Sequence, residues 1–187
     1  EELVRYSSNR SLVPIFGAGF TTGCESYLGT VPNTSTATKD MISLIQKSNS
    51  CPCSADEMSS MDFFSVSDIF FDCVEYNKRA DYFEKKYTNV KLFQPQIDFL
   101  TKIPWPYAYT LNIDDGIEEN SDFSVVLPYH KFRRPKTSKK LLYKLHGDAA
   151  HECKYNDENQ ENIIFSQRQY LRTITEENNS DIYDALL

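Results

Sequence analysis

The chain has 187 residues, of which 40% are hydrophobic, and its formal net charge at pH 7 is -7. This length suits one domain, and 12 Phe and 12 Tyr residues supply ample material for a hydrophobic core. The acidic balance argues against nucleic acid as a partner, because proteins bind phosphate backbones mainly through clustered Lys and Arg.

Lysine and arginine gather at one place in the chain, between Lys131 and Lys140. We interpret this cluster as a solvated loop, with a contact for phosphate or for a partner as the alternative. No segment has the pattern of a signal peptide or is apolar enough to cross a membrane, so we expect a cytoplasmic protein without membrane contact. The first residue is Glu1, and Ser180 to Leu187 resemble a helix cut in mid-course, so we expect a fragment of a longer protein.

The five cysteines are scattered, at Cys24, Cys51, Cys53, Cys73 and Cys153. Cys51 and Cys53 are separated by one residue rather than the two of a usual zinc knuckle, and no second pair follows at metal-ligand spacing. His151 and Cys153 lie together, but far along the chain from that pair. We therefore expect reduced thiols and no bound metal, as is usual in the cytoplasm.

The first half of the chain begins with a strand pattern and continues with helical ones. Leu12 to Phe16 predicts a strand buried on both faces, although Pro14 removes one hydrogen-bond donor from it. From Thr38 to Lys47 the apolar residues recur at helical spacing. Ser48 to Glu57 is polar and contains proline, so we expect a loop there.

An aromatic helical region follows. Phe63 to Val74 predicts a helix with a broad apolar face, Tyr82 to Tyr87 a second helix, and Ile97 to Leu100 a short third one. We interpret the aromatic side chains as the core of a packed helical lobe, with a ligand-stacking wall as the alternative. The lobe is expected to span residues 38–101 and to lie over the crevice of a sheet.

Strand patterns recur in the second half of the chain, at Tyr107 to Leu111, Ser124 to Leu127, Leu141 to Leu145 and Ile163 to Phe165. Directly after the last of them, Ser166 and Gln169 form a capping-box pattern that predicts the start of a helix. Strands that alternate with helices predict an α/β fold, with an open parallel sheet and helices on both of its faces. In such a sheet, ligands bind in the crevice beyond the carboxyl ends of the strands.

The loop after the first strand is rich in glycine. Gly17-Ala18-Gly19 permits close approach of a ligand to the backbone. If a helix starts there, its free N–H groups suit an anionic pyrophosphate, and the hydroxyl of Thr21 could add a donor. The spacing from Gly17 through Gly19 to Gly23 is one residue longer than the dinucleotide fingerprint, so a simple tight turn is the alternative.

Two further loops carry polar residues at predicted strand ends. Asn112 would be partly buried and directed into the crevice, where its amide can hold a water or a hydroxyl; an ordinary turn residue is the alternative. Asp114 caps the helix expected to follow, or holds the loop through backbone amides. His146 titrates near neutral pH and could accept a proton from a hydroxyl or a water, whereas we interpret His130 and His151 as structural.

Together the three loops resemble the sirtuin fold, and more closely the sirtuin-like NAD-hydrolase domains of bacterial anti-phage defence proteins. Leu12 to Thr22 is similar to the glycine loop of that family, and Thr110 to Glu118 to its T-x-N-x-D-x-x-I-E segment. Leu142 to Asp148 is similar to its K-x-H-G segment, and Ile163 to Tyr170 to the strand, turn and helix that follow.

This resemblance implies a Rossmann-like sheet with a small helical lobe, in one SIR2-like domain over residues 1–187, and NAD bound across the crevice. It also implies that Asn112 and His146 are required for catalysis. The residues expected to bind the dinucleotide are Gly17, Ala18, Gly19, Phe20, Thr21, Asp114 and Gly147.

The sequence departs from the sirtuins that remove acyl groups from proteins. Their four-cysteine zinc module is absent, and their G-I-P-D-F-R stretch corresponds here to Gly29 to Thr34, which holds no arginine. Leu111 stands where the family usually has a polar residue, in T-T-N or T-Q-N. The last motif of the family, a glycine-rich turn over the adenosine, would lie beyond Leu187.

We therefore expect hydrolysis of NAD+ at the nicotinamide–ribose bond, giving nicotinamide and ADP-ribose, by an effector of anti-phage defence. Asn112 would fix the attacking water or the ribose hydroxyls, and His146 would accept a proton. A non-catalytic sensor of NAD or ADP-ribose, an interaction module with a decayed site, and a deacylase are the alternatives. Because uncontrolled loss of NAD would harm the host, we expect control by homo-oligomeric assembly or by other domains of the full-length protein.

Overall fold

The computed structural model describes residues 11–48, 53–128, 140–154 and 162–175, together with Tyr6, Asn9 and Cys51. Three predictions concern residues outside these ranges and are not addressed by the structure. They are the helix cut at Ser180 to Leu187, the structural role of His130, and all of the basic cluster except Lys140.

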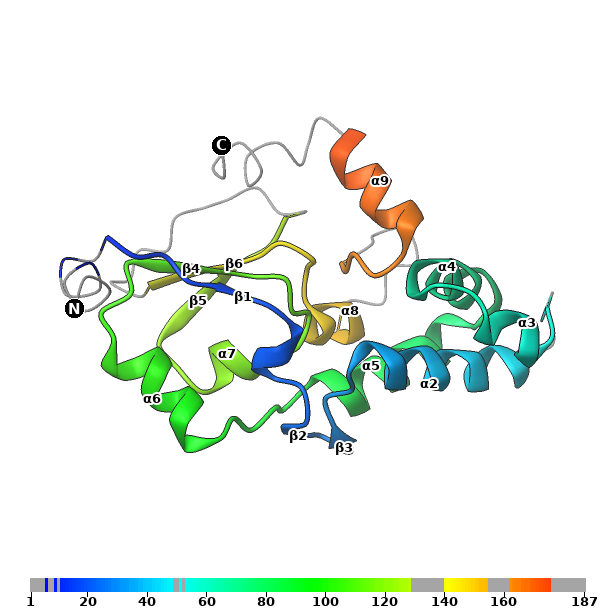
Figure 1. Cartoon of the computed structure of the whole chain (residues 1–187), viewed down its shortest axis with the longest axis horizontal. Helices are drawn as coiled ribbons and strands as arrows, with labels where there is room; N and C mark the ends of the chain where they lie inside the picture. Colours follow the sequence, from blue (N-terminus) through cyan, green and yellow to red (C-terminus); the bar gives the residue numbers. More distant parts are fainter. Residues whose placement is uncertain are drawn as a thin grey trace.

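Four parallel strands form the main sheet (Figure 1). They are β1 (Ile15–Phe16), β4 (Tyr107–Thr110), β5 (Phe123–Val126) and β6 (Lys140–Lys144), in the spatial order β1-β4-β6-β5. Phe16 is in register with Thr110, and Thr110 in turn with Lys144. The predicted α/β class and parallel sheet are confirmed.

The first strand is shorter than the sequence indicated, because only Ile15 and Phe16 pair as a strand. Pro14 precedes them and contributes its carbonyl oxygen, which accepts from the backbone N–H of Tyr109 at 3.0 Å. Proline has no N–H to donate, so it is tolerated at the beginning of a strand that has one described neighbour.

Four helices follow the first strand and a small hairpin of β2 (Glu25–Ser26) and β3 (Gly29–Thr30). They are α2 (Thr34–Gln46), α3 (Ala55–Ser59), α4 (Phe63–Cys73) and α5 (Tyr76–Tyr87). In Figure 1 these helices lie together at the end of the molecule away from β5. Helix α2 packs against α4, and α5 packs against the later helix α8 (Ala149–Lys154).

Capping residues explain where two of these helices begin. The side chain of Asn33 accepts from the backbone N–H of Thr36 at 2.8 Å, so α2 starts four residues before the predicted Thr38. Helix α3 begins inside the stretch predicted as loop, Ser48 to Glu57, and ends two residues beyond it. Ser54 and Glu57 form a capping box there, which satisfies N–H groups that would otherwise lack acceptors.

The remaining helices are α6 (Gln94–Lys102), α7 (Gly116–Glu119) and α9 (Gln167–Thr175). Helices α6 and α7 lie below the sheet in Figure 1, while α9 lies near α4. The predicted capping box of α9 is confirmed, because Ser166 and Gln169 bond each other's backbone N–H groups. A second layer of helices on the opposite face of the sheet, and the division into a core and an inserted lobe, stay predictions.

One continuous hydrophobic core joins the sheet to the helices. It includes Ala108 and Leu142 from the sheet, and Phe70 and Phe83 from α4 and α5, all four fully buried. The interpretation of the aromatic residues as core is thus confirmed for these two. On the other face of the sheet, Tyr109 packs with Val126 and Leu145 in a smaller cluster.

The predicted strand at Ile163 to Phe165 is wrong as a fifth member of the parallel sheet. Ile163 forms an isolated antiparallel bridge with Gly147 instead. The backbone N–H of Ile164 donates to the carbonyl of His146 at 2.8 Å, and that of Asp148 to Asn162 at 3.0 Å. This apolar segment is buried against the loop that follows β6 rather than beside a strand.

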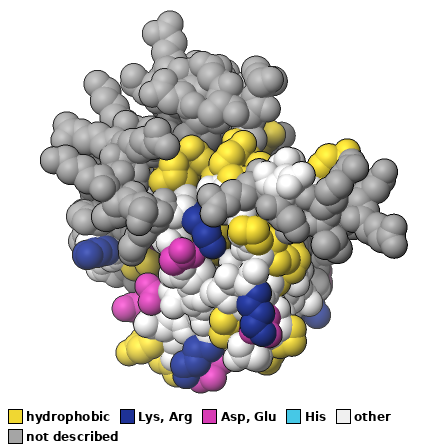
Figure 2. Space-filling model, turned by 90° about the vertical axis from the view of Figure 1, so that its left-hand side faces the viewer, with side chains coloured by type: hydrophobic (Ala, Val, Ile, Leu, Met, Phe, Trp, Pro, Cys, Tyr) yellow, Lys and Arg dark blue, Asp and Glu magenta, His cyan; other side chains and the backbone are white. Residues whose placement is uncertain are grey.

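Charged groups on the described surface are mixed in sign. On the face drawn in Figure 2, side chains of Lys and Arg lie beside those of Asp and Glu, with hydrophobic ones between them. Exposed ion pairs such as Lys102 with Asp98 at 2.6 Å follow the same pattern. Within the described ranges, no helix combines the length and the apolar character needed to span a membrane.

A candidate ligand pocket at the strand ends

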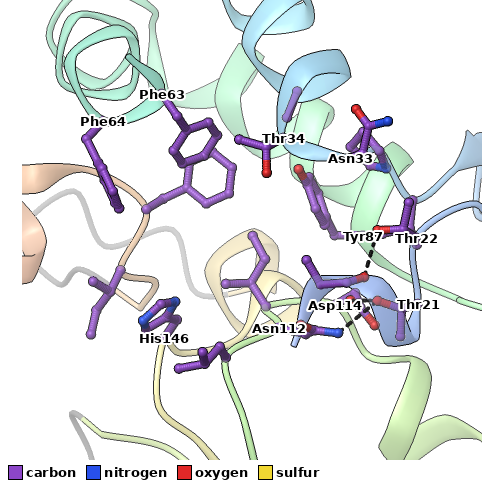
Figure 3. A pocket seen from close by; sticks show the side chains of 18 of the residues that line it. Thr21, Thr22, Asn33, Thr34, Phe63, Phe64, Tyr87, Asn112, Asp114 and His146 are labelled. Carbon is purple, nitrogen blue, oxygen red and sulfur yellow. Dashed lines mark hydrogen bonds between the residues drawn. The ribbon is translucent and has the colours of Figure 1, made fainter. Parts of the chain in front are cut away.

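A pocket of about 390 Å³ lies beyond the carboxyl ends of β1, β4 and β6 (Figure 3). Its walls come from the three loops after these strands, from the segment between β3 and α2, from the helices α2, α4, α5 and α9, and from the segment leading into α9. Pockets of small-molecule sites usually range from about 300 to 1,000 Å³. The crevice predicted at the strand ends therefore exists as a space large enough for a ligand.

The register of the sheet explains which residues reach this pocket. The last paired residues of the three strands are Phe16, Thr110 and Lys144. The residues two positions further on are Ala18, Asn112 and His146, and all three line the pocket. Because the strands are parallel and in register, equivalent positions beyond their ends lie at the same edge of the sheet.

Asn112 belongs to a buried network of polar side chains. Its Nδ2 donates to Oγ1 of Thr21 at 2.9 Å, and Oγ1 of Thr21 donates to Oδ2 of Asp114 at 2.7 Å (Figure 3). Oδ1 of Asn112 is buried and has no hydrogen-bond partner among the residues that the structure describes. The network ties the loop after β1 to the loop after β4.

Asp114 uses both carboxylate oxygens within the protein. Oδ1 accepts from the backbone N–H of Gly116 at 3.0 Å, in addition to the bond from Thr21 to Oδ2. Burial raises the pKa of Asp114, while the bonds from Thr21 and Gly116 and the charge of Lys144 act against this rise. Asp114 lines the pocket as predicted, and the structural role that the sequence left open for it is also present.

His146 lines the same pocket and is partly exposed. Burial lowers the pKa of its imidazole, and a hydrogen bond with the backbone of Leu111 acts against this shift. The ring also meets that of Tyr170 edge-on, with 6.5 Å between the ring centroids. An imidazole with a lowered pKa is neutral at pH 7 and can accept a proton.

Figure 3 shows how the two predicted catalytic side chains lie. The amide of Asn112 is directed toward Thr21 and Asp114, and His146 lies on the side of the pocket that also carries Phe64. The structure thus brings both side chains to one pocket, from segments 34 residues apart in the sequence. Their catalytic roles stay predictions.

Aromatic side chains form much of the opposite wall, a position that the sequence analysis gave only as the alternative for the aromatic helical region. Phe63 and Phe64 come from the first turn of α4, Phe165 from the segment that leads into α9, and Tyr170 from α9 itself. Phe64 is 49% exposed, and the ring centroids of Phe63 and Phe165 lie 5.0 Å apart. Helical periodicity indicated a buried face but not that the start of α4 opens onto the crevice.

The glycine loop contributes fewer residues than predicted. Ala18 and Thr21 line the pocket, but Gly17, Gly19 and Phe20 are not among its lining residues. Residues 18–20 form a single 3-10 turn, which is shorter than a helix with a pyrophosphate site at its N-terminus. The ring of Phe20 packs instead against Phe16, with centroids 4.5 Å apart. Binding of a pyrophosphate by this loop stays a prediction.

Gly147 is also absent from the lining of the pocket, and a structural reason accounts for it. Its φ of +77° lies in the left-handed region, and a Cβ at this position would come within 2.0 Å of the carbonyl oxygen of Asn162. Glycine is needed there so that the loop after β6 can pair closely with residues 162–164. This explanation does not require a ligand.

The buried side chain of Lys144 connects the loops that follow β4 and β6. Nζ of Lys144 donates to the carbonyl of Asp114 at 2.6 Å, to Glu118 at 2.6 Å and to Asp148 at 2.5 Å. Burial opposes the charge of Lys144, but the two carboxylates outweigh it and raise its pKa. Burial raises the pKa of Glu118 to about 8, whereas Lys144 outweighs burial at Asp148 and lowers its pKa. This ammonium group therefore joins the loop after β4, helix α7 and the loop after β6.

Among the described residues, no three side chains of His, Cys, Asp or Glu are grouped so that they could hold a metal ion.

The comparisons with known proteins leave the family of the chain open. No protein-family model matches the chain, and a search of curated proteins found no match.

Proposed function

We propose that this chain hydrolyses NAD+ at the nicotinamide–ribose bond, releasing nicotinamide and ADP-ribose, as an effector of anti-phage defence would. The observation that carries the proposal is the position of Asn112 and His146. An amide and a neutral imidazole follow neighbouring parallel strands at equivalent positions, and both line a pocket next to the loop after β1.

The walls of the pocket suit the two parts of a nicotinamide riboside. Aromatic side chains such as Phe63, Phe165 and Tyr87 offer apolar surfaces for a planar ring, while polar groups lie at the strand ends. Sites of this kind, mostly apolar with a few placed polar groups, are typical of cofactor and substrate binding. The nicotinamide ring would lie toward the aromatic wall and the ribose toward Asn112.

The chemistry asks little of the protein beyond orientation and one proton acceptor. The nicotinamide of NAD+ is already cationic, so it leaves with the electrons of the broken bond and needs no acid. A water oxygen forms the new bond to C1 of the ribose, and its proton passes to the imidazole of His146, directly or through a ribose hydroxyl. Asn112 would hold the water or the ribose hydroxyls in place.

Release of nicotinamide from NAD+ by the purified full-length protein tests the proposal. Asn112→Ala and His146→Ala should each abolish most of the release, while Asn77→Ala and His151→Ala serve as matched controls outside the pocket. Because assembly is expected to control the activity, the assay should cover a range of protein concentrations. Parent protein that releases no nicotinamide at any concentration would refute the hydrolase.

Binding measured by calorimetry separates the other functions. Binding of NAD+ or ADP-ribose without release of nicotinamide would indicate a sensor, and neither binding nor release would indicate an interaction module. Loss of acetyl groups from a peptide that depends on NAD+ would indicate a deacylase. Each result would replace the hydrolase with a defined alternative.

A further inference from the structure

Three buried polar side chains, contributed by the first and second loops of the pocket, form a directed series of hydrogen bonds. Asn112 donates to Thr21, and Thr21 donates to Asp114. Their exposed fractions are 6% for Asn112, 0% for Thr21 and 4% for Asp114. Water therefore cannot readily replace any of these bonds.

The chemistry of the three groups sets the direction of the series. A carboxylate only accepts hydrogen bonds, and Oδ1 of Asp114 already accepts from the backbone of Gly116. A threonine hydroxyl has a single proton, which Thr21 gives to Asp114. Thr21 can therefore only accept from Asn112, so the NH2 group of Asn112 must face Thr21.

This direction fixes which end of the Asn112 amide faces away from Thr21. Oδ1 is the remaining end, and it is buried without a partner among the described residues although Asn112 lines the pocket. Buried polar atoms nearly always have a hydrogen-bond partner in folded proteins. Oδ1 is an unpaired acceptor on a residue that lines the pocket, so a donor group of a ligand is the partner that we infer for it.

We propose that Thr21 and Asp114 are positioning residues that lock the amide of Asn112, so that its Oδ1 accepts a hydrogen bond from an O–H group of the bound substrate or of the attacking water. The inference rests on the proposed function for the identity of the ligand. It assigns Asp114 to the orientation of Asn112 rather than to contact with the dinucleotide. It also explains why a threonine with a buried hydroxyl follows the glycine loop.

Three variants separate orientation from simple stabilisation. Thr21→Val removes the hydroxyl and keeps the shape, while Thr21→Ser keeps the hydroxyl. In Asp114→Asn, the new amide can still accept from Gly116 but presents an NH2 group to Thr21. The proton of Thr21 is then displaced toward Asn112, whose amide must turn over. Thr88→Val is the matched control, because its buried hydroxyl bonds the carbonyl of Glu84 away from the pocket.

The kinetic result expected is a loss of kcat rather than a rise of KM. Thr21→Val and Asp114→Asn should lower kcat by about tenfold to a hundredfold, the range for losing a buried hydrogen bond to a charged group. Thr21→Ser should recover most of the loss seen in Thr21→Val. Wild-type kcat in both Thr21→Val and Asp114→Asn would overturn the inference, as would an equal loss of kcat in Thr88→Val.

NMR of the ligand-free protein supplies a readout that does not depend on activity. The side-chain NH2 signal of Asn112, assigned through its disappearance in Asn112→Ala, should exchange slowly with water in the parent and in Thr21→Ser. It should exchange faster in Thr21→Val and in Asp114→Asn. If the parent releases no nicotinamide but these exchange rates differ as expected, the proposed function fails and the orientation of Asn112 stands. Equal exchange rates in all four proteins would overturn the orientation itself.

Thermal unfolding identifies any variant that fails to fold. Should Thr21→Val be unfolded, Asp114→Asn decides the question alone, because it alters the direction of the series with little change in shape.

Discussion

Asn112 and His146 occupy equivalent positions on neighbouring strands, since each lies two residues beyond one member of the Thr110–Lys144 register pair. Both side chains line one pocket as a result. The parallel pairing of β4 with β6 brings the two residues to the same edge of the sheet. The register matters as well, because a shift by one residue would turn the side chains of one strand to the other face. The site is therefore as well defined as the pairing of β4 with β6.

The lowered pKa of His146 predicts how activity depends on pH. A general base must be unprotonated, and burial lowers the pKa of this imidazole from its usual 6.5. We expect kcat/KM to fall as the pH is lowered, and to reach half of its plateau value at a pH below 6.5. Measurement of NAD+ hydrolysis across this range checks the prediction, with His146→Ala as the control that should lack the inflection. A half-maximal kcat/KM at or above pH 6.5 would contradict it.

Substitution of Gly147 tests the structural account of this residue. Gly147→Ala places a Cβ within 2.0 Å of the carbonyl oxygen of Asn162, at a φ of +77°. We expect a loss of more than about 2 kcal/mol in the free energy of unfolding, because left-handed backbone and a steric clash both disfavour the side chain. Unfolding in urea measures the loss.

Gly19→Ala is the matched control for that substitution. A Cβ at Gly19 would have no atom within 4 Å, so stability should change by less than about 0.5 kcal/mol. An equal loss in both variants would show that the close approach to Asn162 is not the cause.

The sequence predicted the site largely because apolar runs mark where buried strands end. The segments after Phe16, Thr110 and Lys144 could be recognised from such runs, and a parallel sheet brings their ends together whatever the order of its strands. The capping pattern of Ser166 and Gln169 was equally local, and it is confirmed.

Interactions between distant segments could not be predicted in this way. Thr21 and Asp114 are 93 positions apart, and nothing in either local sequence specifies their hydrogen bond. The apolar run at Ile163 resembles a strand, but only the tertiary structure shows that it pairs with the glycine turn after β6. Helix α3 is a different case, since Ser54 and Glu57 form an S-x-x-E pattern that could have indicated it.

Removal of the buried ammonium group should destabilise the loops of the site. Lys144→Met leaves Asp148 and Glu118 without the cation that both contact. We expect a loss of about 3 to 5 kcal/mol in the free energy of unfolding, as for other buried ion pairs that lose one partner. Lys102→Met is the control, because the Lys102 side chain is 72% exposed and its pair with Asp98 should contribute less than about 1 kcal/mol. Similar losses in the two variants would contradict the role assigned to Lys144.

The raised pKa of Glu118 predicts that stability falls as the pH rises. Burial raises this pKa from 4.5 to about 8, so between these values the folded protein holds a proton that the unfolded chain has released. The folded state then binds more protons than the unfolded state, and the free energy of unfolding decreases with increasing pH. Glu118→Gln cannot ionise and should reduce this decrease, while Glu119→Gln, at an exposed neighbour, should not. Urea unfolding at the two ends of the range measures the slopes, and an unchanged slope in Glu118→Gln would show that Glu118 is ionised in the folded protein.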